Sequence, residues 1–172
     1  MIGRYLFLLL AVLAISIAGC GSVNDAGEPG ATDSTRSAAT RQISGNWRGW
    51  LHEAGLAPFE IAVKIGASGT GDVAYTGINC GGEWTLNAVR TSGPPHYLYV
   101  FTEQIKQGAS RVCKGTGRVL LSPIQRQIPN EPAYQRMSYQ FSGGGVNSRG
   151  FIHRTDPEHM QAIYKRAGVP AP

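Results

Sequence analysis

Short runs of β-branched and aromatic residues, separated by Gly, Pro, Asn and Ser, follow one another from Ser44 to Arg154. Within one of these runs, Phe59, Ile61 and Val63 alternate with polar or small residues, which is typical of a strand with one buried and one solvated face. Several short strands at regular spacing predict a sandwich or a barrel. The strands expected cover residues 45–52, 58–65, 71–77, 82–89, 96–105, 111–122, 135–142 and 148–154.

Turn residues support this chain of hairpins. The glycines at 143–145 supply positive φ angles for one hairpin, and the prolines at 94–95 separate another pair of strands. The segment 123–132 holds three prolines and few apolar residues, so we expect it to be the longest exposed loop.

The pattern changes to a helical one after residue 154. Thr155 and Glu158 have the spacing of a capping box, Pro157 suits the first turn, and Gly168 suits the end. The apolar residues between them repeat at helical spacing and are Met160, Ile163, Tyr164 and Ala167. The predicted fold is therefore mainly β, with about eight antiparallel strands in a barrel or sandwich and one short C-terminal helix across it. A helix that instead binds a partner is the alternative.

The first 20 residues have the order of a secretory signal. A positively charged start precedes an apolar run at 5–18, which is shorter than the roughly 20 residues of a spanning helix. The small residues before Cys20 resemble the lipobox of bacterial lipoproteins. That resemblance implies a signal peptide over 1–19 and lipid attachment at Cys20, which anchors the chain stably when several acyl chains are present. Gly21, in place of Asp, implies an outer-membrane or cell-surface location, and an ordinary secretory signal that includes a cysteine is the alternative.

Residues 20–43 are rich in Gly, Ala, Ser, Thr and Asp and poor in large apolar side chains. Such a segment buries too little surface to offset its ordering entropy, which predicts a flexible tether between the lipidated cysteine and the β domain at 44–154. Residues 155–172 then form the helix and the C-terminal tail.

Lipidation of Cys20 would leave Cys80 and Cys113 as an even pair in an oxidising compartment, which predicts one disulfide bond. No C-x-x-C motif is present and the four histidines are scattered, so neither a redox site nor a metal site is expected.

A second resemblance covers residues 44–154. Its motifs are G-x-W-x-G at 45–49, Tyr75 before Cys80, C-G-G-E-W-T-L at 80–86, Glu103 before Cys113, Gly115, and G-F-I-H-R at 150–154. This order is similar to a small secreted β domain that occurs in bacterial lipoproteins and as the extracellular tail of some serine/threonine kinases. The departures are Trp84, where an aliphatic residue is commoner, and a longer proline-rich segment at 124–136. The resemblance implies the fold and the pairing of Cys80 with Cys113, and no reaction.

The tripeptide G-x-W at 45–47 also resembles the first strand of lipocalins and avidins. Eight strands are enough to close a barrel that holds one small ligand. Two roles are then open for Trp47: it plugs the core, or it lines a ligand cavity together with Trp84 and Tyr99.

The residues predict no enzyme. Ser68 lies in an expected turn and not in a G-x-S-x-G elbow, and the glycines around it do not match a dinucleotide fingerprint. His153 and His159 are six residues apart, which fits no common zinc spacing. No catalytic residue, metal or cofactor is therefore expected.

Three acids, Glu60, Glu83 and Glu103, fall on expected strands. A carboxylate pair among them is one interpretation, and a solvated strand face is the commoner one. Glu103 has the strongest claim to a role, although a salt bridge near Cys113 would also account for it.

Charge divides the chain into two halves. Residues 20–103 hold five Lys and Arg against eight Asp and Glu, a net −3, whereas residues 104–172 hold ten against three, a net +7. A basic half favours anionic envelope partners, and the compartment argues against nucleic acid. We therefore expect a lipoprotein of the cell envelope that acts as a non-enzymatic binding or interaction module, anchored by its lipid and bound to an envelope protein or an anionic polymer. A small-barrel carrier of an apolar ligand is the alternative function.

Overall fold

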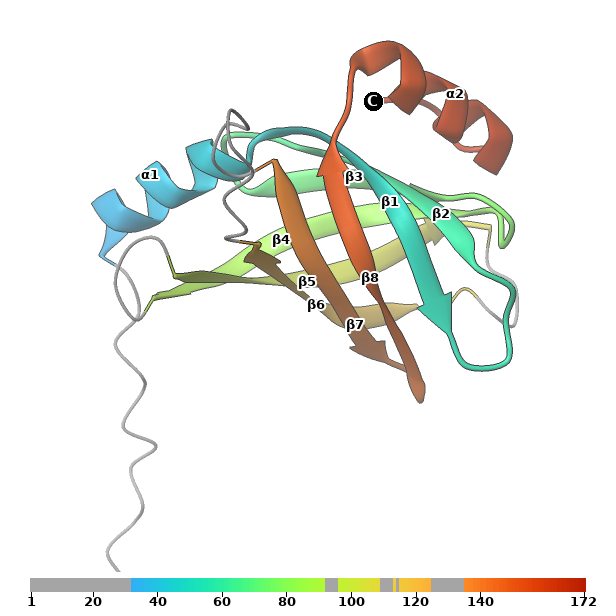
Figure 1. Ribbon diagram of the computed structural model, residues 1–172, viewed down its shortest axis with the longest axis horizontal. Coiled ribbons are helices and arrows are strands. Elements are labelled where there is room, and N and C mark those ends of the chain that lie inside the picture. The colour runs from blue at the N-terminus through green and yellow to red at the C-terminus, as the bar shows by residue number, and fades with distance from the viewer. Residues whose placement is uncertain (1–31, 92–95, 109–112, 114, 125–134) are drawn as a thin grey trace, which may run out of the picture.

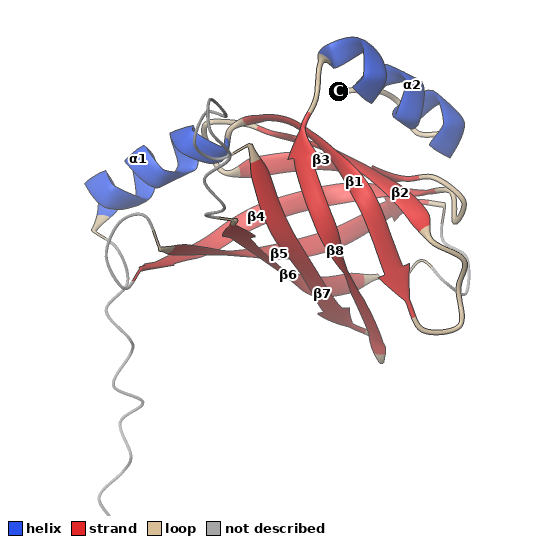
Figure 2. Cartoon of the chain, viewed as in Figure 1, coloured by secondary structure: helices blue, strands red, loops and turns tan. Residues whose placement is uncertain are grey.

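The computed structural model describes residues 32–91, 96–108, 113, 115–124 and 135–172. In these residues, eight antiparallel strands follow one another in chain order around a closed barrel, and two helices flank it (Figures 1 and 2). The strands are β1 Gly45–Glu53, β2 Phe59–Ile65, β3 Thr70–Tyr75, β4 Cys80–Thr91, β5 Tyr97–Gln107, β6 Thr116–Pro123, β7 Arg136–Gly143 and β8 Val146–Arg154. The predicted mainly β fold is confirmed, and the barrel is selected over the sandwich.

The barrel closes where β1 pairs with β8, antiparallel along nearly their whole length. A Cβ atom at Gly49 on β1 would lie 2.0 Å from the carbonyl oxygen of Phe151, and one at Gly150 on β8 would lie 2.1 Å from that of Trp50. Real Cβ atoms do not approach a backbone oxygen so closely, so only glycine fits at these two positions. The close contact between the two backbones at these glycines lets the first and last strands pair and close the barrel.

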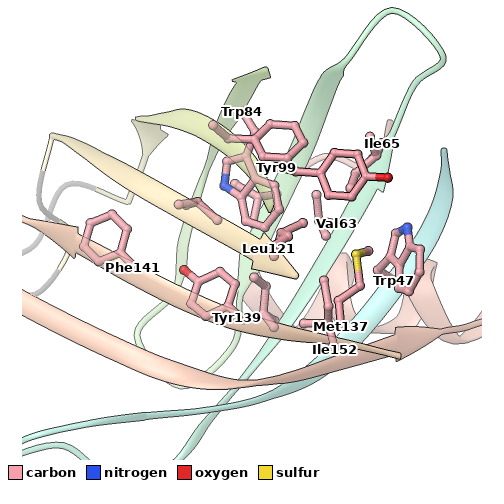
Figure 3. Packing of buried hydrophobic residues seen from close by; sticks show 14 of the residues in the cluster. Trp47, Val63, Ile65, Trp84, Tyr99, Leu121, Met137, Tyr139, Phe141 and Ile152 are labelled. Atoms are coloured by element: carbon pink, nitrogen blue, oxygen red, sulfur yellow. The ribbon is translucent and has the colours of Figure 1, made fainter. Parts of the chain in front are cut away.

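Alternate side chains of each strand fill the barrel. Phe59, Ile61 and Val63 on β2 are at most 4% exposed, as their alternation predicts. Larger rings occupy the middle, among them Trp84 and Tyr99, which are packed between aliphatic side chains of other strands (Figure 3). Burial of one such side chain is worth about 1.5–3 kcal/mol, so this interior is the main source of stability.

The strand limits differ from the expected ones mainly at β6. This strand begins at Thr116, whereas the sequence pattern predicts a start at residue 111; residues 109–112 and 114 lie outside the described part. Residues 125–132 of the predicted long loop also lie outside it. The hairpin between β7 and β8 has positive φ angles at Gly144 and Gly145, as predicted, whereas the prediction is wrong for Gly143, which is the last residue of β7.

The first helix, α1 Asp33–Ile43, corrects the prediction of a flexible tether over 20–43. Its last turns place Ala39 and Ile43 in the core of the barrel, each at most 1% exposed. The prediction is therefore wrong for residues 33–43, because contacts with the barrel compensate for the weak apolar pattern of the segment. Residues 20–31 of the predicted tether lie outside the described residues.

Two side-chain hydrogen bonds join α1 to the barrel. The Tyr99 hydroxyl on β5 donates to the carbonyl oxygen of Ala39 at 3.1 Å, and the Arg36 guanidinium donates to the carbonyl oxygen of Leu86 on β4 at 2.6 Å. The helix is thus held at the barrel end where β1 begins (Figure 1).

The second helix, α2 Pro157–Ala167, packs across the outer face of β2 and β3 (Figure 1). Its apolar side chains cover Ala62 and Ala74, and the helix ends at Gly168 with a φ of 69°, as predicted. The N-cap is Asp156, which accepts a hydrogen bond from the backbone N–H of His159, so the predicted cap at Thr155 is wrong by one residue. Within the described part of the chain, no helix has the length and apolarity needed to cross a membrane.

Candidate functional site

Trp47, one of three predicted ligand-binding residues, plugs the barrel beneath α1. The ring is fully buried, and its Nε1 donates to the carbonyl oxygen of Ile43 at 2.8 Å. The guanidinium of Arg154 lies 4.5 Å from the ring centroid and donates to the carbonyl oxygens of Ser44 and Gln42 at 2.6 and 2.5 Å. This cluster fastens the end of α1 to both the first and the last strand.

The other two predicted residues, Trp84 and Tyr99, are also fully buried. The polar atoms of all three rings bond to the chain itself, and none of the rings lines the barrel cavity described below. A drug-sized ligand needs a pocket of roughly 300 Å³ or more. Neither the barrel cavity nor the outer groove described below is lined by these rings, so the carrier alternative stays a prediction.

Glu103 on β5 lies inside the barrel and is 3% exposed, so the predicted solvated position is wrong for this acid. Its Oε1 accepts a hydrogen bond from the Tyr75 hydroxyl on β3 and one from Nε1 of Trp84 on β4, the latter at 2.9 Å. The Tyr139 hydroxyl on β7 lies 3.4 Å from that of Tyr75. A salt bridge near Cys113 does not explain this residue, because its described partners are neutral donors.

Burial raises the pKa of the Glu103 carboxyl, and the hydrogen bonds from Tyr75 and Trp84 oppose that shift. Burial and the nearby Glu103 charge raise the pKa of Tyr75 and of Tyr139 as well, so both hydroxyls stay protonated. A raised pKa means that the folded state holds the proton of Glu103 more tightly than the unfolded state does. Stability from this group is therefore lost as the pH rises through its folded-state pKa.

A small cavity of about 30 Å³ adjoins Glu103 at the barrel end opposite α1. The described residues that line it are Leu51, Glu53, Phe59, Tyr75, Ile78, Cys80, Glu103, Ile105, Cys113, Tyr139, Phe141, Val146 and Ser148. Most of these side chains are apolar, and the Ser148 hydroxyl donates to Glu53 Oε2 at 2.8 Å. The cavity is thus a mainly apolar space whose lining includes two carboxylates, Glu53 and Glu103.

The predicted disulfide bond is present at the same end of the barrel. Cys80 at the start of β4 is joined to Cys113, with 6.0 Å between their Cα atoms and 33 residues between them in sequence. Both cysteines line the cavity. The bond therefore joins the start of β4 to Cys113 beside the cavity.

A second feature lies on the outside, on the adjacent strands β1, β8, β7 and β6. Trp50 on β1 is 57% exposed, and Phe151, its partner across β8, is 63% exposed. Around this pair the alternation of the strands turns six basic side chains outward, and they are Arg48, His52, Arg118, Arg136, Arg149 and His153. We call these eight residues the basic aromatic face.

Among the described outward positions of these four strands, no Asp or Glu occurs. Arg48 Nε donates to His153 Nε2 at 3.2 Å. Desolvation, followed by the charges of Arg48 and Arg136, lowers the pKa of His153.

An open groove of about 720 Å³ borders the face beside Trp50. Its walls include Arg48 from β1 and Arg166 from α2, together with Thr76 and Gly77 from the turn after β3. Its described lining contains one acid, Glu60, which is paired with Arg166 at 2.5 Å. The groove offers an extended segment a place next to an exposed aromatic ring.

The remaining candidate residues do not come together. Glu83 is exposed and paired with Lys106 at 3.3 Å, and Glu60 lies under α2, so neither approaches Glu103 as a carboxylate pair. His159 bonds to Asp156 at the start of α2. In the described ranges no group of three or more His, Cys, Asp or Glu side chains could hold a metal ion, and Cys20 lies outside these ranges.

The fold and these two features define a disulfide-bonded, eight-stranded antiparallel barrel with a basic aromatic outer face. Comparison with known proteins adds nothing further, because no protein-family model matches the chain and no curated protein matches it either.

Proposed function

We propose that this protein is a lipid-anchored, non-enzymatic interaction module of the bacterial cell envelope that binds an acidic protein partner. The observation that supports this most is the basic aromatic face, which combines four arginines with the exposed pair Trp50 and Phe151 and lacks an acid at its described positions. The cell-envelope location rests on the signal-like N-terminus and on Cys20.

The composition of the face favours a protein partner over a lipid surface or a polymer. Protein interfaces are enriched in aromatic residues and Arg and depleted of Lys, Asp and Glu, and the described outward positions of these strands include no Lys. Trp and Arg are also the commonest energetic centres of such interfaces. A partner that offers carboxylates to the arginines and an apolar side chain to Trp50 would match both the charge and the exposed aromatic ring of the face.

The anchor is tested by Cys20→Ser, which removes the thiol that would carry lipid. We expect the variant to leave the membrane fraction and to lose labelling by radioactive palmitate, because one residue supplies the covalent attachment. Cell fractionation and labelling of the unchanged and variant chains measure this. Retention of both membrane association and label in Cys20→Ser would refute lipidation at this residue.

The partner is tested by photo-crosslinking in intact cells, with a benzophenone amino acid placed at position 50, 151 or 85. Positions 50 and 151 lie on the basic aromatic face, and Thr85 is an exposed position on β4 across the barrel. We expect positions 50 and 151 to form an adduct with the same acidic protein, and position 85 to form none. The adduct is expected to decrease with added salt, because the attraction between exposed charges is screened.

Charge reversal provides the matched control. Arg48→Glu combined with Arg149→Glu is expected to reduce the adduct at least fivefold, whereas Lys64→Glu with Arg90→Glu changes the net charge equally elsewhere and should leave it intact. Adducts with lipid or glycan alone, or an adduct indifferent to both pairs of changes, would contradict a protein partner on this face.

A further inference from the structure

We propose that the cavity beside Glu103 is a binding site for a primary ammonium group at the end of a short apolar chain. This site lies inside the barrel, away from the basic aromatic face, so it goes beyond the function proposed above and stands or falls separately from it. Three features of the cavity support this: the charge of its lining, the second oxygen of Glu103, and its size and walls.

The lining is acidic. Glu53 and Glu103 both contribute to it, and none of the described lining residues is Lys, Arg or His. Tyr139, on β7, lines the same cavity, and its pKa is raised by burial first and then by the charges of Glu103 and Glu53. A buried carboxylate without a cationic partner is costly, so a cation that enters this space supplies what the chain itself does not.

One oxygen of Glu103 is available to such a ligand. Both described donors, the Tyr75 hydroxyl and the Trp84 indole, reach Oε1, and no described residue donates to Oε2. Glu103 lines the cavity, so a ligand there would lie beside this carboxylate. An ammonium group has three donors and would place one of them on Oε2. The neighbouring Tyr139 hydroxyl offers a further acceptor.

The size of the cavity restricts the ligand. A water molecule needs about 10–15 Å³ of such volume, so about 30 Å³ accommodates two waters or one ammonium group with its first methylene. Ile78, Ile105 and Val146 line the outer part and are only partly buried. A short alkyl chain would leave past these side chains, which suits either a free alkylamine or a lysine side chain of another protein.

The experiment is a titration of the purified protein with n-butylammonium chloride at pH 7.5, followed by the indole N–H signals in a ¹H–¹⁵N spectrum. We expect a saturable shift of the Trp84 signal, because this N–H donates to Glu103. The signals of Trp47, at the opposite end, and of Trp50, on the outer face, should not move. Butan-1-ol and butanoate have chains of the same length, and we expect their binding to be at least tenfold weaker.

Variants show whether Glu103 is responsible. Glu103→Gln keeps the shape of the side chain and is expected to weaken butylammonium binding at least tenfold, whereas Glu83→Gln removes an exposed carboxylate and should change nothing. If Glu103→Gln does not fold, Val146→Trp, which narrows the mouth, is expected to abolish the shift in its place. The same titration with Nα-acetyl-lysine methylamide distinguishes a free alkylamine from a lysine side chain as the ligand. Tighter binding of this compound than of butylammonium would assign the site to a lysine side chain.

The pH dependence gives a second readout. The titratable groups that face Glu103 are Tyr75 and Tyr139, which stay neutral, and Glu53 shares the cavity. Since an ammonium ion favours the ionised carboxylate, binding should weaken as the pH falls from 7.5 towards 4.5. Equal affinity for butan-1-ol, unchanged binding in Glu103→Gln, or the absence of a Trp84 shift would each overturn the proposal.

Discussion

Trp47→Ala is expected to lower the free energy of unfolding by about 3–5 kcal/mol, as truncation of a large buried ring usually does. The ring is fully buried, and the variant loses the hydrogen bond to Ile43 and the contact with Arg154 in addition to apolar contacts. Native domains are stable by only about 5–15 kcal/mol, so the loss is a large part of the total. Urea unfolding followed by circular dichroism measures it.

Trp50→Ala is the matched control, because it removes the same side chain from the outer face of the same strand. Its expected cost is below about 1 kcal/mol, the range of a cross-strand pair at an exposed position. Hydrogen exchange adds a local readout: the amides at the end of α1 should exchange faster in Trp47→Ala and not in Trp50→Ala. Equal losses of stability in the two variants would contradict the role of Trp47 as the plug that holds α1.

The strands were predictable because alternation reports which side chains are buried, whatever the partner strand is. The choice between a barrel and a sandwich was not predictable, because closure depends on pairing between β1 and β8, which lie about a hundred residues apart in the chain. The glycines at 49 and 150 permit that pairing. Glycine also occurs in strands at bulges and sharp bends, so its presence alone does not identify the two strands that close a barrel.

The interior position of Glu103 could have been predicted from the alternation of side chains along β5. Glu103 has the same parity on β5 as Tyr97, Tyr99 and Phe101, all of which face the interior, so alternation alone places the carboxylate inside the barrel. The preference of acids for the surface outweighed that pattern in the sequence interpretation. Where a local pattern and a residue preference disagree, a functional position is a common reason.

The helix α1 had no comparable signal. Only Ala39 and Ile43 among its apolar residues enter the core, and the segment contains small and polar residues that resemble a linker. Its order depends on hydrogen bonds from Arg36 and Tyr99 to backbone carbonyl groups, which no sequence periodicity reports. The basic aromatic face was hidden for a similar reason, because it unites β1 with β6, β7 and β8.

Replacing both Cys80 and Cys113 by serine is expected to lower the free energy of unfolding by about 3–4 kcal/mol, because a bond that closes a loop of 33 residues restricts the unfolded chain. The comparison is best made in a Cys20→Ser background, in which no other thiol is present. Urea unfolding of the double variant should match that of the reduced parent protein. Faster hydrogen exchange is expected near the start of β6, beside Cys113.

The location of this bond separates its effect on stability from an effect on binding. Cys80 and Cys113 line the cavity at its mouth, whereas the basic aromatic face lies on the outer surface of other strands. Loss of the bond should therefore weaken butylammonium binding and leave the crosslink at position 50 unchanged while the barrel stays folded. If the double serine variant loses less than about 1 kcal/mol in free energy of unfolding, the entropic explanation of the bond is contradicted. The unfolded chain without the bond would then keep the two positions close through residual structure.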